Sequence, residues 1–501
     1  MTKTRVLLTG ASGSMGGEAF KELMRRQSDY DIVLILRPSK INKKNFKKYL
    51  PSDKLPIGEK GIAQEDGLKI IWGDLTHFPD VLEAVNGVDV VLHPAAFIAP
   101  AADHNPDLAE KINVGGTENI INAIKAQENG IERIKLVYIS SVAIYGDRLA
   151  PIYWLRAGDP LKPSVYDFYA ITKIRAERAV IESGLKYWVS IRQTYIAIAD
   201  SMSLMDPIMF HQPIDQHIEM VTAEDAGYGL VQTIAAPDTF WGGIYNMSGG
   251  PSCRFIYFEY MERSLKNMGI GDFRKVMDRN WFCTRNFHCA WYLDSDKLNG
   301  YLGHWRQTLD DHLQQVRDAA PVYTKLARFA PTSIARGRLE KMTKGKDGTM
   351  NWIETNNQGR IAAFWGSREK WEQIPDWDID MPNVNVEAFR LDHGYNEEIP
   401  FQDLTIEDMR KAAEFRGGEC LSQDVNGGSE KLEWRCAFGH SFKASSKLIL
   451  KAGHWCPECL SPPWNYDEIA KKNPFFAQAY YTNHDKNESN FYDEKCYEDI
   501  L

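Results

Sequence analysis

The segment YAITK, residues 169–173, places a tyrosine and a lysine four residues apart. On a helix this spacing puts both side chains on one face, where a lysine ammonium can lower the pKa of a nearby phenol. Tyr169 could then give or take a proton near neutral pH. A run that ends in the pair Ser140 and Ser141 lies 28 residues before Tyr169, counted from Ser141. A tyrosine and a lysine at this spacing are common by chance, but the combination with the serine pair predicts an acid–base tyrosine.

A second pattern lies near the amino end, where the apolar run RVLL leads into TGASGSMGGEAF, residues 9–20. Gly10, Gly13 and Gly16 are each three residues apart. Glycine is needed where a strand turns at once into a helix, where the backbone approaches a pyrophosphate, and where helix meets strand. The alternative is an ordinary glycine-rich turn. The rest of the domain's sequence is needed to distinguish a phosphate-binding turn from an ordinary turn.

Both patterns require buried strands followed by helices, and residues 4 to 250 alternate short apolar runs with amphipathic stretches. Six runs are interpreted as strands: RVLL, DIVLIL, LKIIWG, VDVVLH, IKLVYIS and YWVSIRQ. Continuous apolar strands separated by helical segments are typical of a parallel sheet covered on both faces. The sequence therefore predicts an α/β fold. We expect a doubly wound, parallel-sheet Rossmann domain over 1–250, a helical cap over 251–330, a connecting region over 331–403, and a small carboxyl-terminal module with a tail over 404–501.

Further motifs follow in order: GDL at 73–75, HPAA at 93–96, NVGGTENII from residue 113 and YISSVAIYG at 138–146. Together with the glycine turn and YAITK, they resemble the extended, epimerase-like short-chain dehydrogenase/reductase family across about residues 4–320. The resemblance implies that Ser141 polarises the substrate oxygen, that Tyr169 is the acid–base, and that Lys173 holds the nicotinamide ribose and tunes Tyr169. It also implies that Arg192 lies beside the nicotinamide end. The expected cofactor-binding residues are Gly10, Ser12, Gly13, Met15, Gly16, Arg37, Asp74, Leu75, Ala95, Asn113, Tyr169, Lys173 and Ile196.

The residue types at the end of the second strand determine which of the two nicotinamide cofactors is preferred. A carboxylate there binds the ribose 2′-hydroxyl of NAD, whereas a basic side chain accommodates the 2′-phosphate of NADP. The strand DIVLIL is followed by RPSK, which supplies Arg37 and Lys40 and no acid. We therefore expect NADP to be preferred, with NAD as the alternative if Arg37 is only a solvated surface residue.

Departures from the family pattern narrow the set of reactions that we expect this chain to catalyse. Sugar dehydratases of this branch carry an Asp-Glu pair after the serine or threonine, whereas Val142 and Ala143 follow Ser141 here. Dehydration is therefore not expected, and an asparagine usual in sugar-nucleotide enzymes is also missing after Arg192. Methionines and aromatics suit an adaptable apolar pocket, although plain core packing is the alternative for each. The pocket candidates are Tyr195, Met202, Leu204, Met205, Met209, Phe210, Trp281, Phe282, Phe287, Trp291 and Tyr292.

The carboxyl-terminal region holds a metal-ligand pattern. WRCAFGHSF and GHWCPEC supply Cys436, His440, Cys456 and Cys459, two tight pairs that can converge on one tetrahedral site. The pattern resembles zinc-ribbon or treble-clef modules over about residues 415–462, and it predicts a structural zinc. Four protein ligands leave no position for water or substrate, so we expect the metal to act through folding alone. CTRNFHC at 283–289 is assigned to packing, because its spacing matches no common metal site.

Composition limits the partners and the location. The 59 Lys and Arg residues against 68 Asp and Glu residues give a formal charge of −9, which favours neither nucleic acid nor a membrane surface as the main partner. No run approaches the length of a membrane helix and no signal peptide is recognisable, so a cytoplasmic protein is expected. Eight cysteines are too few for a disulfide scaffold. A homodimer is compatible with the sequence.

These observations predict a NADP-preferring oxidoreductase that moves a hydride between nicotinamide and a carbonyl or alcohol on an apolar small molecule. Two alternatives stay open: an epimerase that acts through a transient ketone with tightly held NAD, and a redox-sensing binder whose zinc module contacts nucleic acid or protein. The intact Ser141, Tyr169 and Lys173 favour catalysis. We also expect a chain truncated near residue 400 to keep cofactor binding.

Overall fold

A computed structural model of the protein describes residues 3–199, 206–267, 269–320, 331–377, 387–425, 427–490 and 492. Its largest element is an eight-stranded sheet in which neighbouring strands are parallel, except for the edge strand β3, which is antiparallel to β4. The spatial order is β12 (Ile244–Met247), β8 (Trp188–Gln193), β6 (Lys135–Ser141), β5 (Val90–His93), β1 (Thr4–Thr9), β2 (Tyr30–Leu36), β4 (Leu68–Trp72) and β3 (Gly61–Glu65).

Helices cover both faces of this sheet because the strands are apolar on both sides. In β1, Val6 and Leu8 face one buried cluster and Leu7 faces another, as alternation along a strand requires. The first cluster includes α1 (Ser14–Arg25) and α9 (Ala223–Gln232), and the second includes α3 (Phe78–Val85), α6 (Gly116–Lys125) and α8 (Phe168–Ile181). The parallel-sheet Rossmann fold predicted from the sequence is confirmed.

Short connections complete this domain. The shorter helices are α2 (Lys40–Phe46), α4 (Ala101–His104), α5 (Pro106–Ala109) and α7 (Gly130–Arg133). Three two-stranded ladders lie beyond the main sheet: β7 (Trp154–Leu155) with β14 (Trp291–Tyr292), β9 (Ile196–Ala197) with β11 (Val221–Thr222), and β10 (His217–Glu219) with β13 (Arg254–Ile256).

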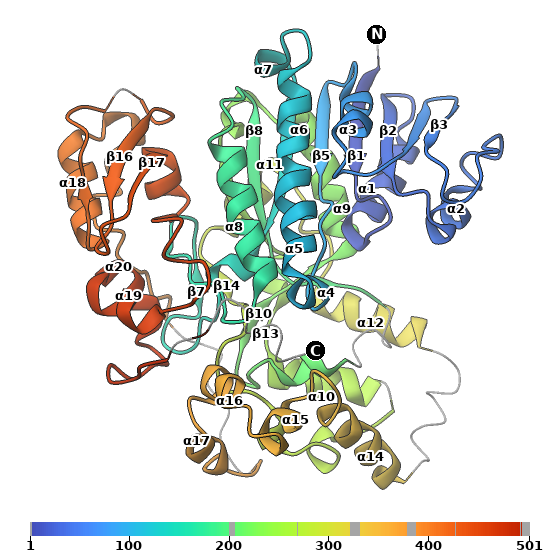
Figure 1. The fold of residues 1–501 in the computed structure, drawn as a ribbon. Helices are drawn as coiled ribbons and strands as arrows, with labels where there is room; N and C mark the ends of the chain where they lie inside the picture. Colours follow the sequence, from blue (N-terminus) through green and yellow to red (C-terminus); the bar gives the residue numbers. More distant parts are fainter. Residues whose placement is uncertain are drawn as a thin grey trace.

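The cap differs from its expected boundaries. α11 (Ser295–Leu302) contacts β12 and buries Leu298 and Leu302 in the Rossmann core, so it belongs to the first domain. The expected connecting region forms helices that share one hydrophobic cluster with α10 and α12. The cap therefore includes α10 (Tyr257–Asn267), α12 (Leu309–Ala319), α14 (Thr332–Thr343), α15 (Thr349–Glu354), α16 (Gln358–Trp365) and α17 (Arg368–Glu372). In Figure 1 these helices lie together below the sheet.

The carboxyl-terminal module lies beside α8, at the left of Figure 1. It contains α18 (Ile406–Phe415), the antiparallel strands β15 (Glu419–Cys420), β16 (Lys431–Arg435) and β17 (Ser441–Ser445), then α19 (Tyr466–Lys472) and α20 (Pro474–Tyr480). α18 begins after Thr405, with a capping box between Thr405 and Asp408.

The module is joined to the Rossmann domain by a continuous apolar cluster. Trp434, Leu448 and Ile449 of the module lie in one buried cluster with Ala176 and Val180 of α8. The tail helices α19 and α20 pack instead on the cap cluster. The module is therefore not an appended unit, because its core and the core of the Rossmann domain are one. Among the described residues, no helix has the length and apolar composition needed to cross a bilayer.

Candidate functional site

Ser141 and Tyr169 come together where β6 ends and α8 begins. Ser141 is the last residue of β6, and Tyr169 is the second residue of α8. Burial raises the pKa of Tyr169 to about 12, and a hydrogen bond with the Ser141 side chain opposes this shift. At neutral pH the phenol is therefore protonated, which suits it to donating a proton.

Lys173 lies one turn further along α8, and its side chain is buried. Its ammonium donates a hydrogen bond to the Ile139 carbonyl oxygen at 2.5 Å and lies 4.6 Å from the centre of the Tyr138 ring. Burial lowers the pKa of this amine to about 7, and the charge of Glu177 opposes the shift. That Lys173 tunes the pKa of Tyr169 stays a prediction. The pKa of that phenol is raised, and the amine is bonded to the backbone of β6.

Two carboxylates that the sequence analysis did not single out hold the amino end of α8. Asp167 precedes the helix, and its Oδ1 accepts a hydrogen bond from the Ala170 amide at 2.7 Å. Asp103 Oδ1 accepts one from the Tyr169 amide at 3.0 Å. Burial, and then the negative charge of Asp167, raise the pKa of Asp103 well above its usual range. His288, from the CTRNFHC segment, lies with Nδ1 3.3 Å from Asp167, so it is a partner of this acidic pair.

Asn113, in the short helical segment Glu110–Gly115 before α6, joins the loop that follows β5 to α8. Its Oδ1 accepts a hydrogen bond from the Phe97 amide at 2.7 Å. Its Nδ2 donates to the Phe97 carbonyl oxygen and to Thr172 Oγ1, both at 2.9 Å. Thr172 immediately precedes Lys173, so Asn113 fixes the loop and the helix together. A direct contact between Asn113 and a cofactor stays a prediction.

The glycine turn has the close approaches that a phosphate cradle requires. Gly10 has a φ of +65°, and a Cβ there would lie 2.8 Å from Ala95 Cα. A Cβ on Gly16 would lie 2.1 Å from the Gly10 carbonyl oxygen. Gly13 begins α1 without any side-chain cap, and the first turn of α1 carries no acidic residue. The amides of this helix end are therefore available to an anion, which fits the pyrophosphate of a dinucleotide.

The side chains around this turn differ in what they can contribute. Ser12 is exposed beside Gly13, whereas the Met15 side chain is only 4% exposed and packs in the core. Any contact between Met15 and a cofactor must therefore come from its backbone. Thr9 Oγ1 accepts a hydrogen bond from the Ala95 amide at 3.2 Å, which ties the loop after β5 to the end of β1.

The remaining expected cofactor contacts follow the carboxyl ends of their strands. Arg37 directly follows β2 and is exposed, and within the described part of the chain no carboxylate forms an ion pair with it. Asp74 and Leu75 follow β4, where Asp74 Oδ1 accepts a hydrogen bond from the Thr76 amide at 2.8 Å. Ile196 begins β9, just after β8 ends. These residues border the same edge of the sheet as the glycine turn.

Arg192 lies in a buried ion cluster under α8, which corrects its expected place at the nicotinamide end. Its Nη2 lies 2.8 Å from Glu177 Oε2 and donates to the Ala452 carbonyl oxygen at 2.6 Å. Its Nη1 donates to the Tyr145 hydroxyl at 2.7 Å. His454 Nε2 lies 2.8 Å from the same carboxylate oxygen of Glu177. Burial alone would raise the pKa of Glu177, but Arg192 and His454 hold it well below its usual range.

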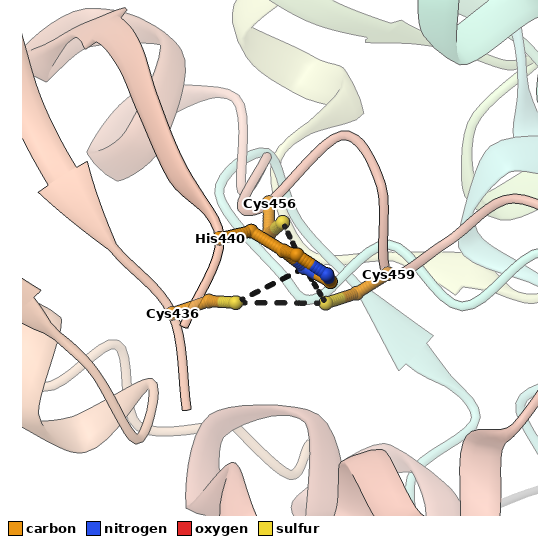
Figure 2. Close-up of side chains that lie close together, drawn as sticks. All are labelled: Cys436, His440, Cys456 and Cys459. Carbon is orange, nitrogen blue, oxygen red and sulfur yellow. Dashed lines mark hydrogen bonds between the residues drawn. The ribbon is translucent and has the colours of Figure 1, made fainter. Parts of the chain in front are cut away.

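Cys436, His440, Cys456 and Cys459 converge, with ligand atoms that all lie within 4.8 Å of one another (Figure 2). The Cys436 and Cys459 sulfurs are 3.7 Å apart, and His440 Nδ1 lies 3.4 to 3.5 Å from the three sulfurs. A tetrahedron with the usual zinc bond lengths has sulfur–sulfur edges of about 3.8 Å and sulfur–nitrogen edges of about 3.6 Å. The four residues therefore fit a closed tetrahedral metal site. Cys420 lies outside this cluster.

Most of the apolar residues suggested for a substrate pocket are core residues. Phe210, Trp281, Phe282, Trp291 and Tyr292 are each at most 5% exposed. Met202, Leu204 and Met205 lie outside the described residues. Tyr195 and Phe287 are partly buried, as is His288, whose ring stacks on that of Phe287 with 4.8 Å between the centres. Core packing therefore explains the larger part of this set.

Comparison with known proteins agrees with this architecture. Residues 6–194 match the NAD dependent epimerase/dehydratase family. The chain is 33% identical over 122 residues to a 3 beta-hydroxysteroid dehydrogenase/Delta 5-->4-isomerase of Mycobacterium tuberculosis, covering 23% of this chain and 31% of that protein. It is 29% identical over 185 residues to a 3-beta-hydroxysteroid dehydrogenase of Mycolicibacterium neoaurum, covering 35% of this chain and 42% of that protein. The chain thus spans less than half the length of these relatives.

Among solved structures, a UDP-glucuronic acid 4-epimerase from Bacillus cereus in complex with UDP-glucuronic acid and NAD matches part of this chain. It is 17% identical and has a TM-score of 0.48, covering 65% of this chain and 100% of that one. The relatives in these sequence matches are named as hydroxysteroid dehydrogenases, and the matched family is described as NAD dependent epimerases and dehydratases.

Proposed function

We propose that the protein is an NAD(P)-dependent oxidoreductase that transfers a hydride between nicotinamide and a carbonyl or alcohol carbon of an apolar small molecule. The observation that carries the proposal is the meeting of the Ser141 and Tyr169 hydroxyls, with Lys173 behind them, at the edge of a Rossmann sheet. The names of the mycobacterial relatives, which are hydroxysteroid dehydrogenases, support an apolar alcohol or ketone as substrate.

The side chains have separate roles in the proposed reaction. The nicotinamide, when bound, supplies or accepts the hydride. In the direction of reduction, Ser141 donates a hydrogen bond to the carbonyl oxygen and Tyr169 gives that oxygen its proton, so the carbonyl becomes an alcohol. With a pKa of about 12, Tyr169 is protonated at neutral pH and so carries the proton that reduction requires. Asp103, Asp167 and Asn113 keep Tyr169 in place through the backbone and side chains of α8.

NADP is the proposed cofactor because of Arg37. Its exposed guanidinium follows β2, where the adenosine ribose is expected, and within the described residues it has no carboxylate partner. NAD is the alternative. The zinc proposed for the Cys436 cluster has a structural role, because four protein ligands would close its coordination.

An epimerase is the second candidate, and the description of the matched family favours it. Such an enzyme would regenerate its cofactor within each turnover and would show no net change in nicotinamide absorbance. An oxidoreductase consumes the cofactor in proportion to substrate. A screen of hydroxysteroids and other apolar ketones and alcohols with NADPH or NADP⁺, followed by absorbance and product analysis, separates the two.

The test of the catalytic assignment is Tyr169→Phe, which removes the proton donor and leaves the ring. We expect turnover to fall by at least about 100-fold, the contribution usual for general acid catalysis, with an unchanged Kd for the cofactor. The control is Tyr187→Phe, which changes a tyrosine that lies before β8, at the opposite end of the sheet. If Tyr169→Phe turns over a true substrate at the wild-type rate, another group donates the proton.

A further inference from the structure

A polar cleft lies where the Rossmann domain, the start of α11 and the carboxyl-terminal module meet. It has a volume of about 420 Å³ and is bordered by the residues that begin β12, by the start of α11, by residues 390–397 and by residues 447–451. β12 runs parallel to the strands between it and β1, so the amino end of β12 lies at the opposite edge of the sheet from the glycine turn. The cleft is therefore separate from the cofactor groove.

Cations outnumber acids in this cleft. Its five cationic side chains are Arg156, Lys297, Arg390, Lys447 and Lys451, and its three carboxylates are Asp294, Asp296 and Glu397. Arg156 is already paired with Glu397, at 2.7 Å. In the described part of the chain, no carboxylate lies within ion-pair distance of the other four cations.

The two module lysines are partly buried and bind only neutral atoms. Lys447 Nζ donates to the Gly242 carbonyl oxygen at 3.2 Å, and Lys451 Nζ to the Tyr395 hydroxyl at 3.3 Å. Burial lowers the pKa of both amines. For Lys451, the negative charge of Glu397 opposes this shift, and the nearby positive charges of Lys297 and Arg156 add to it. The fold therefore holds the positive charges of Lys451, Lys297 and Arg156 close together although they repel one another.

The acids of the cleft offset these positive charges only in part, because two of them are also bonded to other groups and the third lies at the surface. Glu397 Oε1 also lies 2.8 Å from His393 Nδ1. Asp294 accepts hydrogen bonds from Asn246 Nδ2 at 2.9 Å and from the Ala157 amide at 2.8 Å, and burial raises its pKa. Asp296 is exposed on the first turn of α11. Partly buried amines that have no carboxylate within ion-pair distance are unfavourable, and an anion placed among them would gain several charge-assisted contacts.

We propose that this cleft binds a small, multiply charged oxyanion, of the class of a phosphorylated or polycarboxylated metabolite. Its volume suits a ligand of metabolite size, since small-molecule sites span roughly 300 to 1,000 Å³. Lys297 comes from the Rossmann side, whereas Lys447 and Lys451 come from the module, so the anion bridges the two. Binding therefore stabilises the contact between the module and the Rossmann domain.

The test is isothermal titration of the full chain with inorganic pyrophosphate and, separately, with citrate, in saturating nicotinamide cofactor so that the glycine turn is occupied. We expect binding of at least one probe, a higher thermal midpoint on binding, and a Kd raised by about tenfold or more in Lys447→Gln/Lys451→Gln. Lys297→Gln, an exposed change that leaves the module intact, should also raise the Kd.

The control is Lys443→Gln, which removes an exposed charge from β17 outside the cleft and should leave the Kd within about twofold. Tighter binding of pyrophosphate assigns the site to phosphate esters, and tighter binding of citrate assigns it to polycarboxylates. No binding of either probe at millimolar concentration, or a Kd that is the same in the wild type and both cleft variants, overturns the proposal.

Discussion

His454 Nε2 lies 2.8 Å from Glu177 Oε2, although the two residues are 277 positions apart in the chain. Glu177 is on the α8 face that carries Tyr169 and Lys173, at successive intervals of four residues. His454 lies two residues before Cys456 of the proposed zinc cluster. The module that holds the cluster and the helix that holds the proton donor therefore share one buried carboxylate.

Loss of that carboxylate should destabilise the whole chain. Glu177→Ala leaves Arg192 buried without a counter-charge, so we expect the free energy of unfolding to fall by about 3–5 kcal/mol. His454→Ala removes one hydrogen bond to a charged group and should cost about 1.5–3 kcal/mol. Guanidinium denaturation followed by circular dichroism measures both.

The matched control is Glu468→Ala, which breaks an exposed pair with Lys471 and should cost less than about 1 kcal/mol. Equal losses in Glu177→Ala and Glu468→Ala would show that the buried cluster contributes no more than a surface pair.

Removal of the proposed zinc should loosen the loop that carries His454. We expect elemental analysis to find one zinc per chain, and Cys456→Ser to lose it together with a clear drop in the thermal midpoint. Cys420→Ser, a buried cysteine outside the cluster, should retain the metal. A wild-type protein that is folded and contains no metal would contradict this assignment.

The structure changes one expectation about the module. Truncation near residue 400 was expected to leave a cofactor-binding Rossmann domain. It would remove the His454 partner of Glu177 and uncover the apolar face of α8 at Ala176 and Val180. We now expect the truncated chain to be poorly soluble, because the buried apolar surface of the two parts is continuous.

Lys173→Met should stabilise the cofactor-free protein while removing a functional group. Burial lowers the pKa of this amine from 10.5 to about 7, so the folded state disfavours its charge. Below pH 7 the whole penalty is present in the wild type. Between pH 7 and 10.5 the unfolded state binds the proton and the folded state does not, so wild-type stability rises with pH.

The gain from Lys173→Met should therefore be largest below pH 7, up to about 5 kcal/mol less the lost hydrogen bond, and should shrink toward pH 10.5. Unfolding free energies of both proteins across this range measure it. Lys125→Met, an exposed change on α6, provides the control. A gain that does not change with pH would show that the amine of Lys173 is not titrating in the folded state.

Local sequence patterns were sufficient to predict the strands of the sheet and the residues of the metal cluster. The apolar run DIVLIL lies within β2 (Tyr30–Leu36), and IKLVYIS overlaps β6 (Lys135–Ser141). Both runs were recognisable because strands that are buried on both faces must be continuously apolar. The ligands of the Cys436 cluster were identifiable because each pair closes within a few residues along the chain.

Other features depend on contacts between distant segments and leave no local trace. Asp103 meets Tyr169 from 66 residues away, and Glu177 meets His454 from 277 residues away. The helices α15 and α17 contain only six and five residues, too few turns to show a helical period. The tryptophans of that region, such as Trp352, are buried by packing on the cap, which sequence spacing does not indicate.

Cofactor choice is expected to depend on Arg37. Its side chain is exposed at the end of β2, and Asn42 Nδ2 donates a hydrogen bond to the Arg37 carbonyl oxygen at 2.9 Å, which fixes the backbone there. A charged guanidinium attracts the 2′-phosphate of NADPH, and a carboxylate at the same place binds the 2′-hydroxyl of NADH. We expect the wild type to bind NADPH at least about tenfold more tightly than NADH, and Arg37→Asp to reverse that order.

Fluorescence titration with both cofactors measures the four Kd values. Lys44→Asp, the same charge change on an exposed residue of α2, should leave the order unchanged. Equal affinities of the wild type for NADPH and NADH would mean that Arg37 has no part in recognising the ribose.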